Sequence, residues 1–225
     1  MIYKKSWKYI LIKDKIYIYK YYRLKAVKNF SNVKKGYLGG YIQGYYNLSQ
    51  SGNCWVYYNA KISEDAQVYG NAKIYDYSQI SDNAQVYGNA YIKGDAKIFG
   101  RAQVSGNARV DGSAQIFEGA SISGNAIISE NPRISGFAEV TEKAIVTGNA
   151  AVYGLTRIYG NAKVSDFAQV FGYAEITGNA QIYENAHISG HSRITGDVKI
   201  HEDTRVSEFT DISKLWYIKK LGNIY

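Results

Sequence analysis

Cysteine and proline each occur only once in this chain of 225 residues, and it has no long apolar run. Because Cys54 is the single cysteine and occupies a small-residue position of a repeat, we expect neither a disulfide nor a reactive thiol. Apolar runs such as residues 9–12 are far shorter than the ~20 residues of a membrane-spanning helix. Lys4, Lys5 and Lys8 stand where a secretion signal would begin, but no apolar stretch of about seven residues follows. The sequence therefore predicts a cytoplasmic protein.

Acidic residues are almost missing from the first part of the chain. Residues 1–53 contain eleven Lys/Arg and one acid, Asp14, which gives +10; residues 54–225 contain sixteen basic and eighteen acidic residues, which gives −2, and the sum is the net charge of +8. The excess positive charge therefore lies in the N-terminal part.

A strict six-residue register occupies most of the chain. From Val56 to Ile212 every sixth residue is Ile or Val, twenty-seven times, and the residue two positions earlier is small, alanine in nineteen cases. Residues two apart on a strand share a face, so both positions point inward. The Gly-Asn or Glu-Asn pair that often follows suits a corner, because Gly and Asn tolerate positive φ. Short strands separated by corners predict a β-solenoid.

The repeat small-x-[IV]-x-[GED]-[ND], as in residues 84–89, resembles the hexapeptide-repeat proteins over roughly residues 54–215. The resemblance implies an all-β fold, a left-handed parallel β-helix with three hexads per triangular coil. Twenty-seven hexads then make about nine coils. We expect an N-terminal β cap over residues 1–53, the β-helix over 54–215 and a capping tail over 216–225.

A narrower resemblance lies upstream of the register. Residues 29–33 read NFSNV and residues 36–57 read GYLGGYIQGYYNLSQSGNCWVY, which is similar to the start of the YdcK-type hexapeptide proteins of bacteria and phages. Those proteins are named transferases largely by fold. A label based on fold is weak support for a chemical activity.

Residues 7–27 predict a β-hairpin cap with a Lys-Asp-Lys turn, which would place Ile12 opposite Ile16. One face would be aliphatic and plug the first coil, and the other would be aromatic. Cations flank that aromatic face, as on a platform for single-stranded nucleic acid. The predicted contacts to RNA, single-stranded DNA or an acidic partner are Lys8, Tyr19, Lys20, Tyr21, Arg23, Lys25 and Lys28. The alternative is that these lysines reflect the codon bias of an AT-rich genome.

Every eighteenth residue recovers one outer row of the solenoid. One set of hexads carries large apolar side chains on successive coils, and such patches mark interfaces. The predicted protein interface consists of Phe99, Phe117, Phe137, Tyr153, Leu155, Phe171 and Tyr173. A partner protein or a second copy of the chain would cover them.

Signals for catalysis are few. Hexapeptide acyltransferases use a histidine base and often a loop between hexads, but no hexad here carries an insertion. His191, and after it His187, are the candidate bases, and an ordinary surface role is the alternative. We find no metal-spaced cluster or phosphate-binding loop, and we predict no cofactor or metal.

The favoured interpretation is therefore a non-catalytic binding or scaffold protein that presents a rigid surface and a basic cap to a macromolecule. One version is a phage or mobile-element protein in the host cytoplasm that blocks a nucleic-acid-guided defence nuclease. The alternative is an acyl transferase of the hexapeptide class that uses acetyl-CoA.

Overall fold

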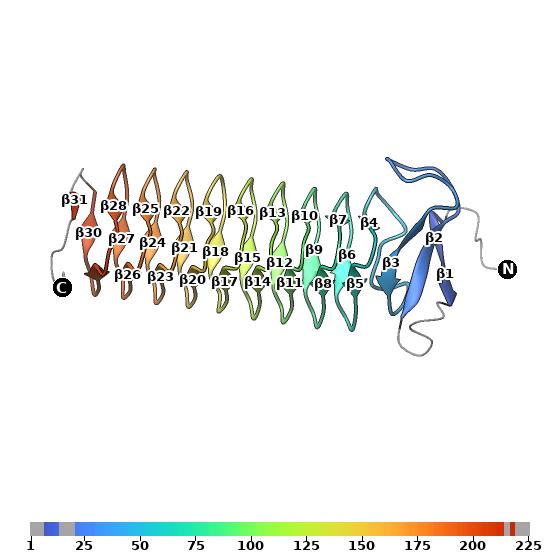
Figure 1. Cartoon of the computed structure of the whole chain (residues 1–225), viewed down its shortest axis with the longest axis horizontal. Coiled ribbons are helices and arrows are strands. Elements are labelled where there is room, and N and C mark those ends of the chain that lie inside the picture. The colour runs from blue at the N-terminus through green and yellow to red at the C-terminus, as the bar shows by residue number, and fades with distance from the viewer. Residues whose placement is uncertain (1–6, 14–20, 214–216, 219–225) are drawn as a thin grey trace.

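The computed structural model describes residues 7–13, 21–213 and 217–218. It is a long β-solenoid with an antiparallel hairpin at its N-terminal end (Figure 1). Within these residues, no helix is long and apolar enough to cross a membrane. The predicted fold class, an all-β parallel solenoid with a hairpin cap, is confirmed.

The described strands form three long sheets, named here sheet 1, sheet 2 and sheet 3 in the order in which each coil visits them. In sheet 1 lie β1 (Tyr9–Lys13), β2 (Tyr22–Ala26), β3 (Leu38–Ile42), β5 (Lys61–Ile62), β8 (Gln79–Ile80), β11 (Lys97–Ile98), β14 (Gln115–Ile116), β17 (Arg133–Ile134), β20 (Ala151–Val152), β23 (Gln169–Val170), β26 (His187–Ile188) and β29 (Arg205–Val206). In sheet 2 lie β6 (Gln67–Val68), β9 (Gln85–Val86), β12 (Gln103–Val104), β15 (Ser121–Ile122), β18 (Glu139–Val140), β21 (Arg157–Ile158), β24 (Glu175–Ile176), β27 (Arg193–Ile194) and β30 (Asp211–Ile212). In sheet 3 lie β4 (Trp55–Val56), β7 (Lys73–Ile74), β10 (Tyr91–Ile92), β13 (Arg109–Val110), β16 (Ile127–Ile128), β19 (Ile145–Val146), β22 (Lys163–Val164), β25 (Gln181–Ile182), β28 (Lys199–Ile200) and β31 (Tyr217–Ile218).

The hexad register produces the core as predicted. Each solenoid strand pairs in parallel with the strand eighteen residues further on, as when Gln85 aligns with Gln103 and Val86 with Val104. The alanines and the Ile/Val positions point inward; Ala102 and Val104, for example, are fully buried. Gln103 between them is exposed. Small and branched side chains thus fill the narrow interior in layers, one layer per coil.

The corners adopt backbone conformations with positive φ. Glycine occupies many of them, such as Gly136 with φ of 68°, where an added Cβ would lie 2.6 Å from the backbone nitrogen of Gly154. Ten Asp or Glu residues adopt the same conformation, at positions 64, 76, 82, 118, 130, 142, 166, 184, 202 and 208. Left-handed backbone costs roughly 1 to 2 kcal/mol for a residue with a Cβ, so something else must stabilise these acidic corners.

The solenoid has about ten turns, one more than the register predicts. The additional turn is formed by the segment before the first hexad, where β3 pairs in parallel with β5 and Leu48 forms a parallel bridge to Val68. Tyr41 aligns with Lys61 and Leu48 with Val68. Both pairs are twenty residues apart rather than eighteen, so a count of strict hexads misses this coil.

The hairpin is present, but its predicted register is wrong. β1 and β2 pair with Lys13 opposite Tyr22 and Ile12 opposite Arg23, so the strands do not meet across a three-residue turn. The inward face also differs from the prediction, because Tyr9 and Leu24 are fully buried while Ile10 is 37% exposed. The hydroxyl of Tyr9 donates a hydrogen bond to the carbonyl oxygen of Leu48 in the first coil, 2.5 Å away. Tyr9 and Leu24 therefore pack against the first coil, where the sequence predicts a face of isoleucines.

Candidate interaction surface on the solenoid

A row of large side chains follows the corner between sheet 1 and sheet 2 over consecutive coils. This corner row consists of Phe137, Leu155, Tyr173, His191 and Phe209. Phe137 is 68% exposed, Tyr173 56% and Phe209 82%. Contiguous apolar groups in water are costly, and on a monomeric protein they mark interaction sites.

The repeat explains why these side chains line up. Each follows a corner residue with positive φ, so the chain turns at the same place in every coil. The rings then stack directly: those of Tyr173 and His191 lie 4.5 Å apart at an angle of 5°, and those of His191 and Phe209 lie 4.8 Å apart at 3°. The stacking fixes the rings in one orientation, which lowers the entropy lost when a partner covers them.

Charged side chains run beside the corner row on sheet 2. The outward residues of β18, β21, β24 and β27 are Glu139, Arg157, Glu175 and Arg193, and each aligns with the next. We call these four residues the charge row. Arg193 Nε lies 3.6 Å from Glu175 Oε2. Tyr159 also donates its hydroxyl hydrogen to Glu175, and this bond is the main cause of the raised pKa of Tyr159.

The two rows enclose a shallow groove. Its lining comprises Phe137, Leu155, Tyr173 and His191 on one side and Glu139, Arg157 and Glu175 on the other. The combination of apolar groups with charges of both signs resembles the composition of protein interfaces, where apolar anchors are surrounded by polar groups.

The seven predicted interface residues divide between this corner row and a second row on sheet 1. Phe99 stacks on Phe117 and Tyr153 stacks on Phe171, each at 4.9 Å between ring centroids. The guanidinium of Arg133 lies 5.5 Å from the Phe117 ring centroid. Ser135 separates the two stacks, so this row is shorter and less exposed than the corner row.

The sequence prediction missed the last two members of the corner row. These are His191, which the sequence suggests only as a candidate base, and Phe209. They lie eighteen and thirty-six residues after Tyr173, so the same eighteen-residue reading carried to the last coil would have found them.

A known protein family matches part of the solenoid. The family model described as YdcK Beta solenoid repeat matches residues 102–118, which run from β12 through β14. Over these residues the chain is similar to the YdcK β-solenoid repeat. No curated protein matches the chain. The sequence-based recognition of a YdcK-type solenoid is thus confirmed, and the handedness stays a prediction.

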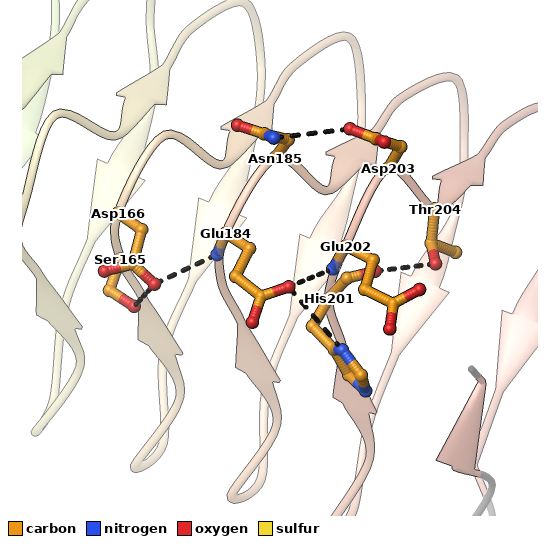
Figure 2. Close-up of polar contacts among 8 residues, drawn as sticks. All are labelled: Ser165, Asp166, Glu184, Asn185, His201, Glu202, Asp203 and Thr204. Atoms are coloured by element: carbon orange, nitrogen blue, oxygen red, sulfur yellow. Dashed lines mark hydrogen bonds and ion pairs between the residues drawn. The ribbon is translucent and has the colours of Figure 1, made fainter. Parts of the chain in front are cut away.

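The corners of the solenoid also contain a ladder of carboxylates. In Figure 2, Asp166 Oδ2 accepts a hydrogen bond from the backbone nitrogen of Glu184 at 3.0 Å, and Glu184 Oε2 accepts one from Glu202 at 2.7 Å. Glu64, Asp76, Asp82, Glu118 and Glu142 accept equivalent bonds from the next coil. Each bond is charge-assisted and offsets the left-handed backbone of the acidic residue. These carboxylates are therefore structural.

An asparagine ladder occupies the corner between sheet 2 and sheet 3. The side-chain nitrogen of Asn71 donates to Asn89 Oδ1 at 3.0 Å, Asn89 to Asn107 at 2.9 Å and Asn107 to Asn125 at 3.1 Å. These side chains line another groove together with Lys73, Tyr91, Lys93 and Arg109. The ladder links one coil to the next through hydrogen bonds between stacked amides.

The two candidate bases do not resemble a catalytic site. His187 aligns with Arg205 on sheet 1, and His191 is stacked between Tyr173 and Phe209. Among the described residues, neither ring has a carboxylate partner that would orient it as a base. The described residues also contain no group of three His, Cys, Asp or Glu that could hold a metal. Acyl transfer stays an untested prediction.

The structure changes the set of cap residues available to a partner. Lys8 is only 1% exposed, and its Nζ donates to the carbonyl oxygens of Ser51, Gly52 and Cys54. Its predicted contact with nucleic acid is therefore wrong, because these carbonyl oxygens at the start of the solenoid hold the ammonium inside. Burial lowers the pKa of Lys8 and raises the pKa of the Cys54 thiol.

The other predicted cap contacts differ in accessibility. Lys25 and Lys28 are exposed, whereas Tyr21 and Arg23 are half-buried. Arg23 Nε donates to the carbonyl oxygen of Gly39, and its guanidinium lies 5.4 Å from the Tyr41 ring centroid. Tyr19 and Lys20 lie outside the described residues.

Proposed function

We propose that this YdcK-type solenoid is a non-catalytic binding protein that presents the corner row to a macromolecular partner. The observation that carries the proposal is the run of exposed large side chains over five consecutive coils, from Phe137 to Phe209. The rigid stack of coils holds their spacing at about 4.8 Å, the usual distance between paired strands. Binding to such a surface needs little reorganisation of the protein.

The test is a pull-down from host lysate with the tagged full chain, with and without nuclease treatment. The variant Phe137→Ser, Tyr173→Ser, Phe209→Ser removes the Phe and Tyr side chains of the corner row. We expect it to lose at least about tenfold in recovered partner, because aromatic anchors dominate interface energies. Circular dichroism should show an unchanged fold, since all three side chains point outward.

A matched control comes from another corner. Tyr77 and Phe167 are 61% and 60% exposed and lie between sheet 3 and sheet 1. Tyr77→Ser with Phe167→Ser removes two aromatic groups of comparable exposed fraction and should leave recovery unchanged. Equal recovery by wild type, the corner-row variant and the control would refute the proposal. The narrower hypothesis that the partner is a host defence nuclease stays a prediction, which the identity of the recovered protein tests.

A specific observation supports a second contact, with nucleic acid at the cap. Residues 21–53 contain five Lys/Arg and no Asp or Glu, and Lys25, Lys28, Lys34 and Lys35 are exposed. Because the segment carries no carboxylate of its own, its net positive charge suits phosphates. The nuclease arm of the pull-down separates this contact from direct protein binding.

A further inference from the structure

The charge row has a symmetry of its own. Read along the solenoid axis, Glu139, Arg157, Glu175 and Arg193 alternate in sign. When the row is reversed, every position meets the opposite charge: Glu139 meets Arg193 and Arg157 meets Glu175. A surface of this kind is complementary to itself in the antiparallel orientation.

From this symmetry we infer that a second copy of the chain docks on the corner groove, antiparallel to the first. The two-fold axis lies across the coils, between the coil of Arg157 and that of Glu175. The inference rests on the proposed function, because it names the partner of the same corner row. A parallel, in-register arrangement would instead place each charge against its own copy, which is unfavourable.

The same two-fold axis also brings apolar side chains of the two copies together. Because the corner row and the charge row share their coils, the axis that pairs Arg157 with Glu175 also places Leu155 against Tyr173 and Phe137 against His191. The groove lined by these residues extends over the same four coils and is centred on this axis. An isologous contact would therefore cover apolar side chains and pair charges at the same time.

Beside the charge row, the second outward row of sheet 2 has one large side chain. Ser123, Thr141, Thr177 and Thr195 are short, and Tyr159 stands among them with its hydroxyl bonded to Glu175. The axis that pairs Arg157 with Glu175 places Tyr159 against the short Thr177 of the other copy, which leaves room for it. From Ser121 to Asp211 the two copies overlap over six coils, or about 24 Å at about 4.8 Å per coil. An overlap of this length places the contact at the small end of specific interfaces, so we expect a dimer that dissociates on dilution.

Two reciprocal charge reversals test the axis. In Arg157→Glu alone or Glu175→Arg alone, like charges face each other twice across the axis, so each variant should bind itself at least about tenfold more weakly than wild type binds itself. In a one-to-one mixture of the two variants, a mixed dimer has opposite charges at both of these contacts, because the two reversals face each other at one and the two native residues at the other. Sedimentation velocity should therefore show a mixed dimer where neither variant dimerises alone. Both residues are on the outside of the solenoid, and circular dichroism checks the fold.

The outcomes separate the dimer from the broader proposal. A wild-type chain that stays monomeric at about 500 μM, or a mixture that stays monomeric where wild type dimerises, overturns the antiparallel dimer. Rescue in the mixture supports this axis. An axis one coil further, between Glu175 and Arg193, would place the Arg157→Glu carboxylate against Asp211 and gives no rescue. If the dimer fails but the corner-row variant still loses its partner from lysate, the proposed function stands. If the dimer fails and the corner-row variant also recovers as much partner as wild type, both the dimer and the proposed function fail.

Discussion

The ammonium nitrogen of Lys8 lies 3.2 Å from the sulfur of Cys54 and 3.0 Å from the carbonyl oxygen of the same residue. This buried pair joins the hairpin to the first hexad, across forty-six positions in sequence. The ammonium satisfies carbonyl oxygens that the open end of a solenoid would leave without donors.

Replacement of this lysine should weaken the cap. In Lys8→Met the side chain keeps much of its apolar length but donates no hydrogen bonds, so the carbonyl oxygens of Ser51, Gly52 and Cys54 lose a donor. We expect a loss of about 1 to 3 kcal/mol. Hydrogen exchange should report it as faster exchange in β1 and β2 with little change in the distant coils, because solenoid units contact only their neighbours. Uniformly faster exchange along the solenoid would contradict this local role.

The same residue should give stability a distinct pH dependence. Burial lowers the pKa of Lys8 below 10.5, so between the lowered pKa and 10.5 the unfolded chain binds more protons than the folded chain. The free energy of unfolding contributed by Lys8 therefore rises with pH in that window and is lost as pH falls through the lowered value. The Cys54 pKa is raised from 9.0, which acts in the opposite direction above that pH. Denaturant titrations should show wild type gaining on Lys8→Met as pH rises toward 10.5, with Cys54 present in both proteins; parallel curves would argue against a shifted Lys8.

Two adjacent positions on β12 test the register of the core. Val104 is fully buried and Gln103 exposed. Val104→Asp would bury an unpaired charge and should cost several kcal/mol, roughly 3 or more, whereas Gln103→Glu should be nearly silent. Thermal denaturation of the two variants gives the comparison. Equal melting temperatures would contradict the assignment of Val104 to the inside and Gln103 to the outside.

An acidic corner offers a test of the carboxylate ladder. Glu142 has a φ of 58°, and its Oε2 accepts a hydrogen bond from the backbone nitrogen of Gly160 at 2.9 Å. Glu142→Ala keeps the left-handed backbone and loses the bond, so it should cost about 1 to 2 kcal/mol. Glu142→Gly relieves the backbone, and Glu142→Gln keeps an acceptor oxygen; both should be more stable than Glu142→Ala. An alanine variant as stable as these two would mean that the ladder contributes nothing measurable.

Nucleic-acid binding at the cap can be tested with charge reversals. Lys25→Glu with Lys28→Glu should abolish affinity for labelled single-stranded DNA or RNA, and wild-type affinity should fall steeply with salt, because lost phosphate contacts remove counterion release. Lys163→Glu with Lys199→Glu makes the same change in charge on the outside of sheet 3, far from the cap, and should retain binding. Fluorescence anisotropy measures all three proteins. If both variants bind with the same affinity and the same salt dependence, the net charge of the protein, and not the cap, determines the affinity for nucleic acid.

The periodic part of the molecule was predictable because each residue's environment is set by its position in the hexad. The burial of Ala102 and the alignment of Phe137 with Leu155 both follow from counting by six and eighteen. The cap follows no period. The burial of Lys8 depends on carbonyl groups more than forty positions away, and the turn that contains Leu48 is spaced by twenty residues. Such long-range contacts leave no local pattern from which to predict them.

The eighteen-residue coil also limits how this surface can change through insertions and deletions. Loss of eighteen residues removes one whole coil and leaves every outer row aligned, only shorter. Loss of six residues turns everything downstream by one side of the triangle, so that Phe209 would move from the corner row to a different edge. The length of the contact surface and the direction it faces can therefore be altered separately, in whole steps, while the interior of alanine and Ile/Val layers stays intact.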